Sequence, residues 1–408
     1  MTTITPPHMT RWLTSLRANR WPDRALVRAG AIYMLIAYVP MLMHVFAEAT
    51  GHVGSDFLAF WGAGRLVMAG TPWLAFDLVA EQGAQAASHT GQMVAYVNPP
   101  PYLFLTGPLA LMPYGAAWLT WALGSWMAWF LACRRLLPGE PLVLLSCPAA
   151  YLAACHAQNG FVTGALLVAG VMALSRTGVM ALSRKGGRAE IIAGLLFGAL
   201  VIKPHLALLI PLWLIAGRRW RALGAAAASA LALCLLSLMV FGPETWAAWP
   251  KSFQVSAVLM EQNAAPFFLR MATPYALIRV LAGANVAIAA QIVITLAMVV
   301  LVWGETRRLG ANAGTGALML AATAIASPYL FSYDFPFLVQ PLLWLVGMAR
   351  TNGWRPWEKI CVIALWLAPL ATRAAALPLH ANLMPLAGIG LVWMIVGRLR
   401  ADQSTISG

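Results

Sequence analysis

The chain has few charged residues. Of its 408 residues, only 10% are Asp, Glu, Lys or Arg, whereas 61% are hydrophobic. A soluble domain normally carries about 25% charged residues, so too few charges are present to cover a water-soluble globule of this size. The composition therefore predicts that lipid surrounds most of the chain, and that the chain crosses a membrane several times.

The hydrophobic runs lack the alternation that is typical of membrane β-barrel strands. Long Leu, Ala and Val runs instead predict helices, because backbone polar groups in lipid must be satisfied within each segment. We expect an all-α polytopic membrane protein with about 12 transmembrane helices of about 17–25 residues each. Residues 25–400 would form a single integral membrane domain, between a cytoplasmic N-terminal segment at 1–24 and a cytoplasmic tail at 401–408.

Several common signals are also missing. The five cysteines form no Cys-x-x-Cys pair, so we interpret them as small core residues. Residues 1–24 lack the short apolar core and cleavage site of a secretory signal, and the first span is expected to direct insertion. No glycine-rich loop follows a strand. Gly62 and Gly64 indicate close helix packing, so no cytoplasmic nucleotide site is expected.

Positive charge dominates, and it is distributed unevenly. The formal net charge is +14. Basic loops follow alternate spans, which places both ends of the chain inside. Of the 27 lysines and arginines, 21 fall on the inner face, in agreement with the positive-inside rule. The six cations expected outside are Arg65, Lys203, Lys251, Arg270, Arg279 and Arg373.

Two segments expected on the outer face are too long to be simple connections. They cover residues 47–114 and 242–284. In the first, residues 57–69 and 77–88 are predicted to be amphipathic helices that lie in the membrane interface. The prolines of residues 98–101 then end any helix, because proline lacks the amide donor.

Polar residues are rare in this chain, and many of them gather on the predicted outer face. Polar and ionisable groups inside a membrane protein are costly, and they often mark a functional site. We therefore interpret the outer set as a binding or catalytic site. Its members are Asp56, Arg65, Asn98, His156, Gln158, Asn159, Lys203, His205, Glu261, Asn263, Arg270, Tyr329, Tyr333 and Asp334.

The charged members suggest distinct roles. Asp56 follows the first span, and we interpret it either as a helix cap or as a general base. Lys203, an interior lysine beside a proline, favours an anionic ligand such as a phosphate. Arg270 and Arg65 would assist it, with headgroup contact as the alternative for each arginine. Asp334 is a second carboxylate, expected to pair with Lys203 or Arg270 and to orient them.

The uncharged members suggest contacts with a sugar or a lipid headgroup. His156, Gln158 and Asn159 place several donors and acceptors at one helix end, although hydrogen bonds between helices are an alternative. Trp61 and Trp73, near Asp56, are candidates for stacking on a sugar ring. No His or Asp cluster has metal-ligand spacing, so we expect no bound metal.

The order of these motifs resembles glycosyltransferase family 87. These polytopic enzymes of the GT-C superfamily include mycobacterial polyprenyl-phosphate mannosyltransferases that act on glycolipids, and the resemblance covers roughly residues 25–400. Ala157 stands where the family usually has glycine before Gln-Asn. The motifs are Asp-Phe (56–57), Gly-Thr-Pro-Trp (70–73), Asn-Pro-Pro (98–100), Gln-Asn-Gly (158–160), Lys-Pro-His (203–205), Arg-Arg-Trp-Arg (218–221), Gln-Asn (262–263), and Ser-Pro-Tyr (327–329) followed by Tyr-Asp (333–334).

The resemblance implies an enzyme of the bacterial inner membrane, with its active site facing the periplasm. Such an enzyme moves a sugar, a mannose-like hexose or a pentose, from a polyprenyl-phosphate carrier to a lipid or glycan acceptor, with inversion at the anomeric centre. It needs neither a cofactor nor nucleic acid.

The resemblance also implies roles for individual residues. Asp56 matches the position of the family's catalytic base. Lys203, His205 and Arg270 would bind the donor phosphate. The substrate-binding residues would be Arg65, Asn98, His156, Gln158, Asn159, Asn263, Tyr329, Tyr333 and Asp334.

Two other functions compete with a transferase. One is a transporter or flippase of a lipid-linked or small anionic substrate, and the other is a cell-envelope assembly factor that binds glycolipid without turnover. The sequence shows no matched pair of broken helices in two related halves, which many secondary transporters have. The gathering of polar residues on one face suits a transferase or an assembly factor better than a transporter.

Overall fold

The computed structural model describes residues 7–20, 22–51, 53–175 and 184–404. The first residues of the predicted N-terminal segment (1–6) and the last of the predicted tail (405–408) lie outside this part. In the described residues, the regular elements are helices, and an isolated β-bridge joins Met271 to Phe331. The elements are α1 (Pro7–Arg17), α2 (Arg24–Thr50), α3 (Phe57–Met68), η1 (Pro72–Phe76), α4 (Leu78–Ala86), η2 (Pro100–Tyr102), α5 (Leu103–Leu109), α6 (Tyr114–Cys133), α7 (Pro141–Leu145), α8 (Pro148–His156), α9 (Gly160–Ser175), α10 (Arg184–Gly198), η3 (Ala199–Ile202), η4 (Pro204–Ala207), α11 (Ile210–Ala216), α12 (Trp220–Ala248), α13 (Lys251–Arg270), α14 (Pro274–Ala282), α15 (Ala284–Leu309), α16 (Ala313–Ala326), η5 (Ser332–Leu338), α17 (Val339–Asn352), α18 (Glu358–Ala375) and α19 (Met384–Ser404).

Five helices of the described part are long and apolar enough to cross a membrane: α2, α6, α12, α15 and α19 as far as Ala401. Only 11% of the apolar window of α2 and 6% of that of α12 are buried within the protein. Lipid must therefore cover most of these two helices. The predicted all-helical class is confirmed, but the predicted number of about 12 spans is not shown, because several expected spans are shorter than the roughly 20 residues that a crossing needs. The shorter apolar helices are Phe57–Met68, Gly160–Ser175, Pro204–Ala216 and Ala313–Ala326.

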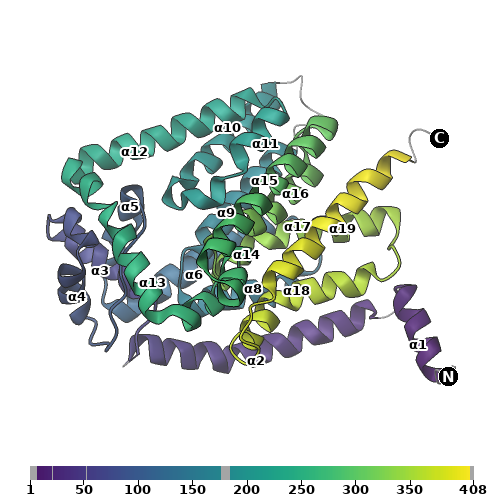
Figure 1. The fold of residues 1–408 in the computed structure, drawn as a ribbon, viewed down its shortest axis with the longest axis horizontal. Coiled ribbons are helices and arrows are strands. Elements are labelled where there is room, and N and C mark those ends of the chain that lie inside the picture. The colour runs from purple at the N-terminus through teal and green to yellow at the C-terminus, as the bar shows by residue number, and fades with distance from the viewer. Residues whose placement is uncertain (1–6, 21, 52, 176–183, 405–408) are drawn as a thin grey trace.

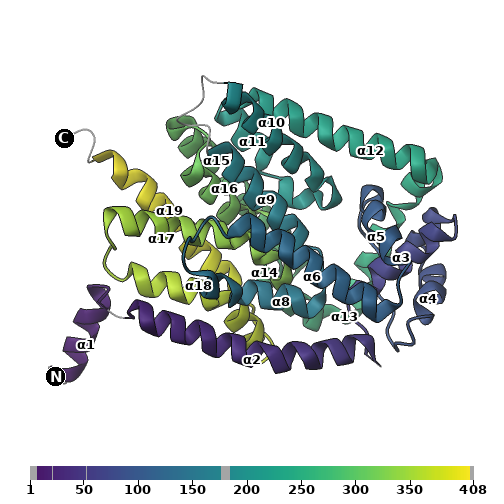
Figure 2. The same cartoon turned by 180° about the vertical axis from the view of Figure 1, so that it is seen from behind.

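The helices form an elongated bundle with two distinct ends (Figures 1 and 2). In Figure 1, α2 runs along the lower edge and α12 along the upper edge. The helix α1 and the end of α19 lie at one end of the molecule, and α3, α4 and α5 lie at the other. The helices α3, α4 and α5 are therefore separated from α1 and the end of α19 by the length of the bundle.

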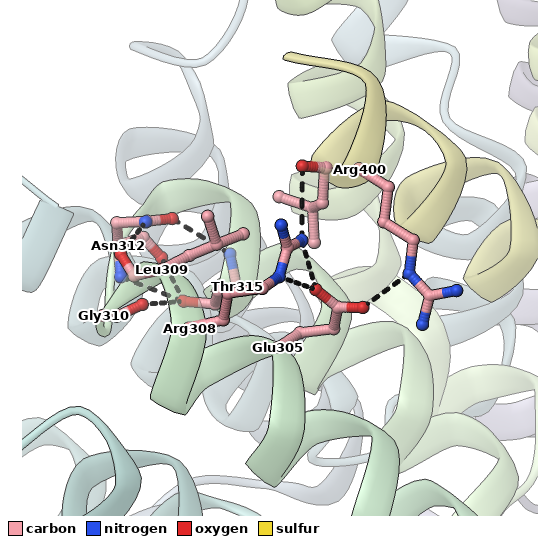
Figure 3. Close-up of polar contacts among 8 residues, drawn as sticks. Glu305, Arg308, Leu309, Gly310, Asn312, Thr315 and Arg400 are labelled. Atoms are coloured by element: carbon pink, nitrogen blue, oxygen red, sulfur yellow. Dashed lines mark hydrogen bonds and ion pairs between the residues drawn. The ribbon is translucent and has the colours of Figure 1, made fainter. Parts of the chain in front are cut away.

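Ion pairs join helices at the end of the bundle where arginines gather (Figure 3). Glu305 of α15 is 4% exposed, and its carboxylate accepts hydrogen bonds from Arg308 Nε at 3.1 Å and from Arg400 Nε of α19 at 2.7 Å. The next helix, α16, begins with a capping box in which Asn312 Oδ1 accepts from the amide of Thr315 at 3.1 Å. A buried carboxylate is tolerated here because two guanidinium groups compensate its charge.

The helix α3 differs from the predicted interfacial helix. Residues 57–64 are all buried, so no polar face of this stretch meets water. The helix packs against α4, α5 and η1. Gly64 permits this packing, because a Cβ there would lie only 2.2 Å from the carbonyl oxygen of Thr106. The close helix packing predicted from the glycine pair is confirmed, whereas the polar face expected of an amphipathic helix is absent from residues 57–64.

The chain breaks its helical path at Lys203. The predicted spans at 191–202 and 206–216 are instead α10, the short turns η3 and η4, and the seven-residue α11. Lys203 has non-helical backbone angles (φ −151°, ψ 71°), and Pro204 after it cannot donate an amide hydrogen bond, so the helix is broken at this point. The break places the Lys203 side chain in the protein interior, where it is 7% exposed.

Candidate active site

Asp56 lies at the N-cap position of α3, but its side chain does not cap the helix. Instead, Asp56 Oδ2 lies 3.3 Å from Nδ1 of His156, the last residue of α8. Each of the two side chains is 35% exposed. The helix-cap interpretation of Asp56 is therefore wrong, and the carboxylate is accessible from solvent.

Ser55 fixes the backbone just before Asp56. Its Oγ accepts a hydrogen bond from Trp118 Nε1 of α6 at 3.1 Å and lies 3.3 Å from the hydroxyl of Tyr114. It also accepts from the amide of Phe57 at 3.3 Å. Ser55 could not be selected from the sequence, because a serine before a helix is common and its partners come from a helix about 60 residues later in the chain.

The polar residues at and after the end of α8 contact two different parts of the site. Ala157 has a left-handed backbone with φ 44°, a conformation that favours glycine, which is the residue the resembled family usually has here. After this turn, Gln158 hydrogen-bonds to Asp56, whereas Asn159 Oδ1 accepts from Lys203 Nζ at 2.8 Å. The turn therefore connects the Asp56 carboxylate to the break at Lys203.

Lys203 is fully engaged by protein groups. Its Nζ forms an ion pair with Asp334, which is 0% exposed, and donates to Asn159. The same Nζ lies 5.5 Å from the ring centroid of Tyr333, a cation–π contact. The other oxygen of Asp334, Oδ2, accepts from the amide of Phe331 at 3.0 Å. The ion pair expected between Asp334 and one of two cations is thus formed with Lys203.

Tyr333 lies between the two carboxylates of the site. Its ring centroid is 5.1 Å from that of His156, its ring stacks on Phe331, and it also contacts the ammonium group of Lys203. Gly160, the first residue of α9, fixes this position, because a Cβ there would lie 1.9 Å from the carbonyl oxygen of Tyr333. Only glycine fits against the Tyr333 backbone. The site is therefore continuous from Asp56 through His156 and Tyr333 to Lys203.

His205 and Tyr329 belong to the same two stretches of chain as the residues just described. His205 follows Lys203 by two residues, and Tyr329 precedes Tyr333 by four. The rings of His205 and Tyr329 are perpendicular, with centroids 5.9 Å apart. In the described part of the chain, Nε2 of His205 is buried and has no hydrogen-bond partner. A buried polar atom without a partner is costly, so this nitrogen is suited to a ligand. Among the described residues, no three His, Cys, Asp or Glu side chains gather as a metal site would require.

The pKa of Asp56, which lies outside the five candidate spans, is below its ordinary value. Partial burial raises the pKa of this carboxyl, but the contact with His156, the hydrogen bond from Gln158 and the charge of Arg270 together lower it by more. Arg270 is the last residue of α13. Asp56 is therefore ionised at neutral pH, which is the form that can accept a proton.

Two predicted members, Arg65 and Asn98, are not brought into this site. Arg65 lies about 13 Å along α3 from Asp56, and it is exposed, with its guanidinium carbon 5.0 Å from the Trp61 ring centroid. Asn98 is half-buried at a bend, and no hydrogen bond or ion pair of the described residues joins it to the others. Asn263 belongs to α13, but its side chain lies outside the described part.

Comparison with known proteins gives one match. Neither the search of curated proteins nor that of solved structures gave a significant match. A sequence profile of glycosyltransferase family 87 matches residues 96–332, which is more than half of the chain. The matched region contains His156, Lys203 and Arg270, and it begins after Asp56. The chain belongs to glycosyltransferase family 87.

Proposed function

We propose that this glycosyltransferase moves a mannose-like hexose or a pentose from a polyprenyl-phosphate carrier to a lipid or glycan acceptor, at the periplasmic face of a bacterial inner membrane. The observation that carries the proposal is the state of Asp56. Its carboxylate is ionised and accessible, and it is held by His156 and Gln158 rather than used as a helix cap.

Asp56 would act as the general base. The acceptor hydroxyl gives its proton to the carboxylate while its oxygen attacks the anomeric carbon, and the bond from that carbon to the phosphate oxygen breaks. The bonding pair leaves with the lipid phosphate, and attack from the opposite side inverts the anomeric centre. A positioned base of this kind contributes roughly 10²- to 10⁴-fold to a rate.

The donor phosphate and the sugar would meet different groups of the site. His205, through its unpartnered Nε2, and Arg270 are the candidates for the phosphate. His156, Gln158, Tyr329 and Tyr333 are candidates for the sugar and the acceptor. Lys203, Asn159 and Asp334 are already bonded to one another, so direct contact of Lys203 with a phosphate would require that its ion pair opens.

The length of α2 supports a periplasmic location. This helix has 27 residues, from Arg24 to Thr50, and Asp56 follows it closely. At about 1.5 Å per residue its length is about 40 Å, which exceeds the roughly 30 Å hydrocarbon layer. If α2 spans the membrane, Asp56 would lie on the opposite side from Arg24 and Arg28, and the positive-inside rule favours the cytoplasmic side for those arginines.

Transfer from defined donors tests the proposal. The purified protein in nanodiscs is given polyprenyl-phosphate mannose, glucose or arabinose, together with a glycolipid extract of the source cells, and the labelled lipid products are separated. Transfer from one donor, with release of polyprenyl phosphate, is the expected result. No product from any donor, combined with movement of the labelled donor across a liposome membrane, would support a flippase and contradict the proposal.

Replacing His156 with Ala is expected to narrow the pH range of activity. Without the imidazole, partial burial raises the pKa of Asp56 while Gln158 and Arg270 alone lower it. Because the base works only when deprotonated, activity is lost as the pH falls through this pKa. The acidic limb of kcat/KM for the acceptor should therefore move to higher pH.

The control for this variant is His44→Ala, which removes an exposed histidine of α2. It should leave the profile of the wild type unchanged. If His156→Ala lowers the activity by the same factor at every pH, the imidazole does not set the pKa of Asp56.

A further inference from the structure

Among the described residues, Arg270 and Arg373 form no ion pair with a carboxylate. The ion pairs between arginine and Asp or Glu are formed by other arginines. On the same side of the protein, Arg279 pairs with Glu261 and Lys203 pairs with Asp334. The sequence placed Arg373 among the outer cations but suggested no role for it.

The fold brings Arg373 to the same level as His156. Leu370 of α18 packs with Tyr151 and Leu152 of α8. Arg373 lies three residues beyond Leu370, and His156 lies four residues beyond Leu152, so each is about one helical turn further along its helix. The two helices also contact each other and η5 directly.

A second contact joins the region after α18 to the end of α13. Asn382 is 2% exposed, and its Nδ2 donates to the carbonyl oxygen of Leu269 at 3.2 Å. Arg270 follows Leu269 directly. The charge of Arg270 acts on both Arg373 and Asp56, so its guanidinium group is within electrostatic range of each.

Holding two like charges near one another with no carboxylate in ion-pair contact costs free energy, and the partial burial of Arg373 increases that cost. A ligand with negative charge removes the repulsion and gains charge-assisted hydrogen bonds. Arginine is well suited to this because its planar group matches the oxygens of a phosphate in pairs. In the proposed reaction the phosphate leaves on the side of the anomeric carbon opposite to the acceptor and Asp56, so a phosphate site is expected near Asp56 but not in contact with it.

We propose that Arg270 and Arg373 together bind the phosphate group of the lipid-linked donor, and that Arg373 is a ligand-binding residue of the site. This assignment rests on the proposed function for the identity of the phosphate. It gives Lys203 a different task, because its ammonium group is used within the protein.

Binding of a short donor analogue tests the assignment without turnover. Farnesyl phosphate is titrated against the full-length protein in phosphatidylcholine nanodiscs, with farnesol as the neutral analogue. Arg373→Gln and Arg270→Gln should each weaken farnesyl phosphate binding by about tenfold, since each removes charge-assisted hydrogen bonds. Binding of farnesol should not change in either variant, and Arg373→Lys should recover part of the loss.

The matched control is Lys251→Gln, which removes one positive charge from the exposed start of α13. Wild-type affinity in this control is expected. Equal weakening in Lys251→Gln and Arg373→Gln would show a general effect of charge, and wild-type affinity in Arg373→Gln would remove Arg373 from the site. Either result overturns the proposal.

Two competitors identify the source of the phosphate. Inorganic phosphate should compete weakly because it lacks the isoprenoid chain, and phosphatidylglycerol should compete less well than unlabelled farnesyl phosphate. If phosphatidylglycerol competes equally, the pair is a headgroup site and the donor assignment is wrong. A negative binding result would overturn only the assignment of Arg270 and Arg373 to the donor phosphate. The proposed function fails only if sugar transfer fails.

Discussion

Replacement of Asp56 by Asn is expected to lower the rate of sugar transfer by about 10²- to 10⁴-fold and to leave the fold intact. The amide cannot accept the acceptor's proton. Loss of a true helix cap typically costs about 1 kcal/mol, but the Asp56 side chain makes no capping bond and is 35% exposed. The free energy of unfolding should therefore change little. Single-turnover transfer and thermal unfolding of the purified variant measure the two effects.

Asp77→Asn is the matched control for Asp56→Asn. Asp77 is a true cap of α4, because its Oδ1 accepts from the amides of Val79 at 3.0 Å and Ala80 at 2.9 Å. Asparagine keeps that acceptor, so both transfer and stability should match the wild type. Near-wild-type transfer by Asp56→Asn would show that another group is the base.

Replacement of Lys203 by Met is expected to destabilise the protein by about 3–5 kcal/mol, because it leaves the Asp334 carboxylate buried without a partner. The double variant Lys203→Met with Asp334→Asn should recover much of this loss. Asparagine is neutral, and its oxygen can still accept from the amide of Phe331. Equilibrium unfolding in mixed detergent measures the three variants.

An ion pair with an exposed carboxylate on the same side provides the comparison for Lys203. Arg279 pairs with Glu261, whose side chain is 64% exposed. Glu261→Gln should therefore cost less than about 1 kcal/mol. If Lys203→Met instead keeps its stability and loses only donor binding, Lys203 contacts the donor directly, as its position beside a proline first suggested.

The helical class and the members of the site were largely predictable from the sequence. Hydropathy is a local property, so the apolar helices α2, α12 and α15 could be identified without any knowledge of their neighbours. The rarity of polar residues made His156 and Lys203 visible as candidates. The structure brings both into contact with the Tyr333 ring.

Other features depend on contacts between segments that are distant in the sequence. The burial of α3 arises from its packing against α4 and α5, which its own periodicity does not report. Arg65 lies in the same helix as the start of the site, but the rise of that helix carries it away from Asp56. A partly buried arginine such as Arg373 is a signal in a chain with so few charges, but only the fold shows that a second arginine lies within electrostatic range of it.

Gly160 has a consequence for how this enzyme tolerates genetic change. Its Cα approaches the Tyr333 carbonyl so closely that even one methyl group must push two backbones apart, since the side chains have no freedom to absorb it. Gly160→Ala is expected to displace Tyr333 and to reduce both transfer and melting temperature. A saturation screen scored by activity alone would rank Gly160 beside Asp56, although glycine supplies no reactive group. Scoring protein abundance in the same library would separate these two kinds of intolerance.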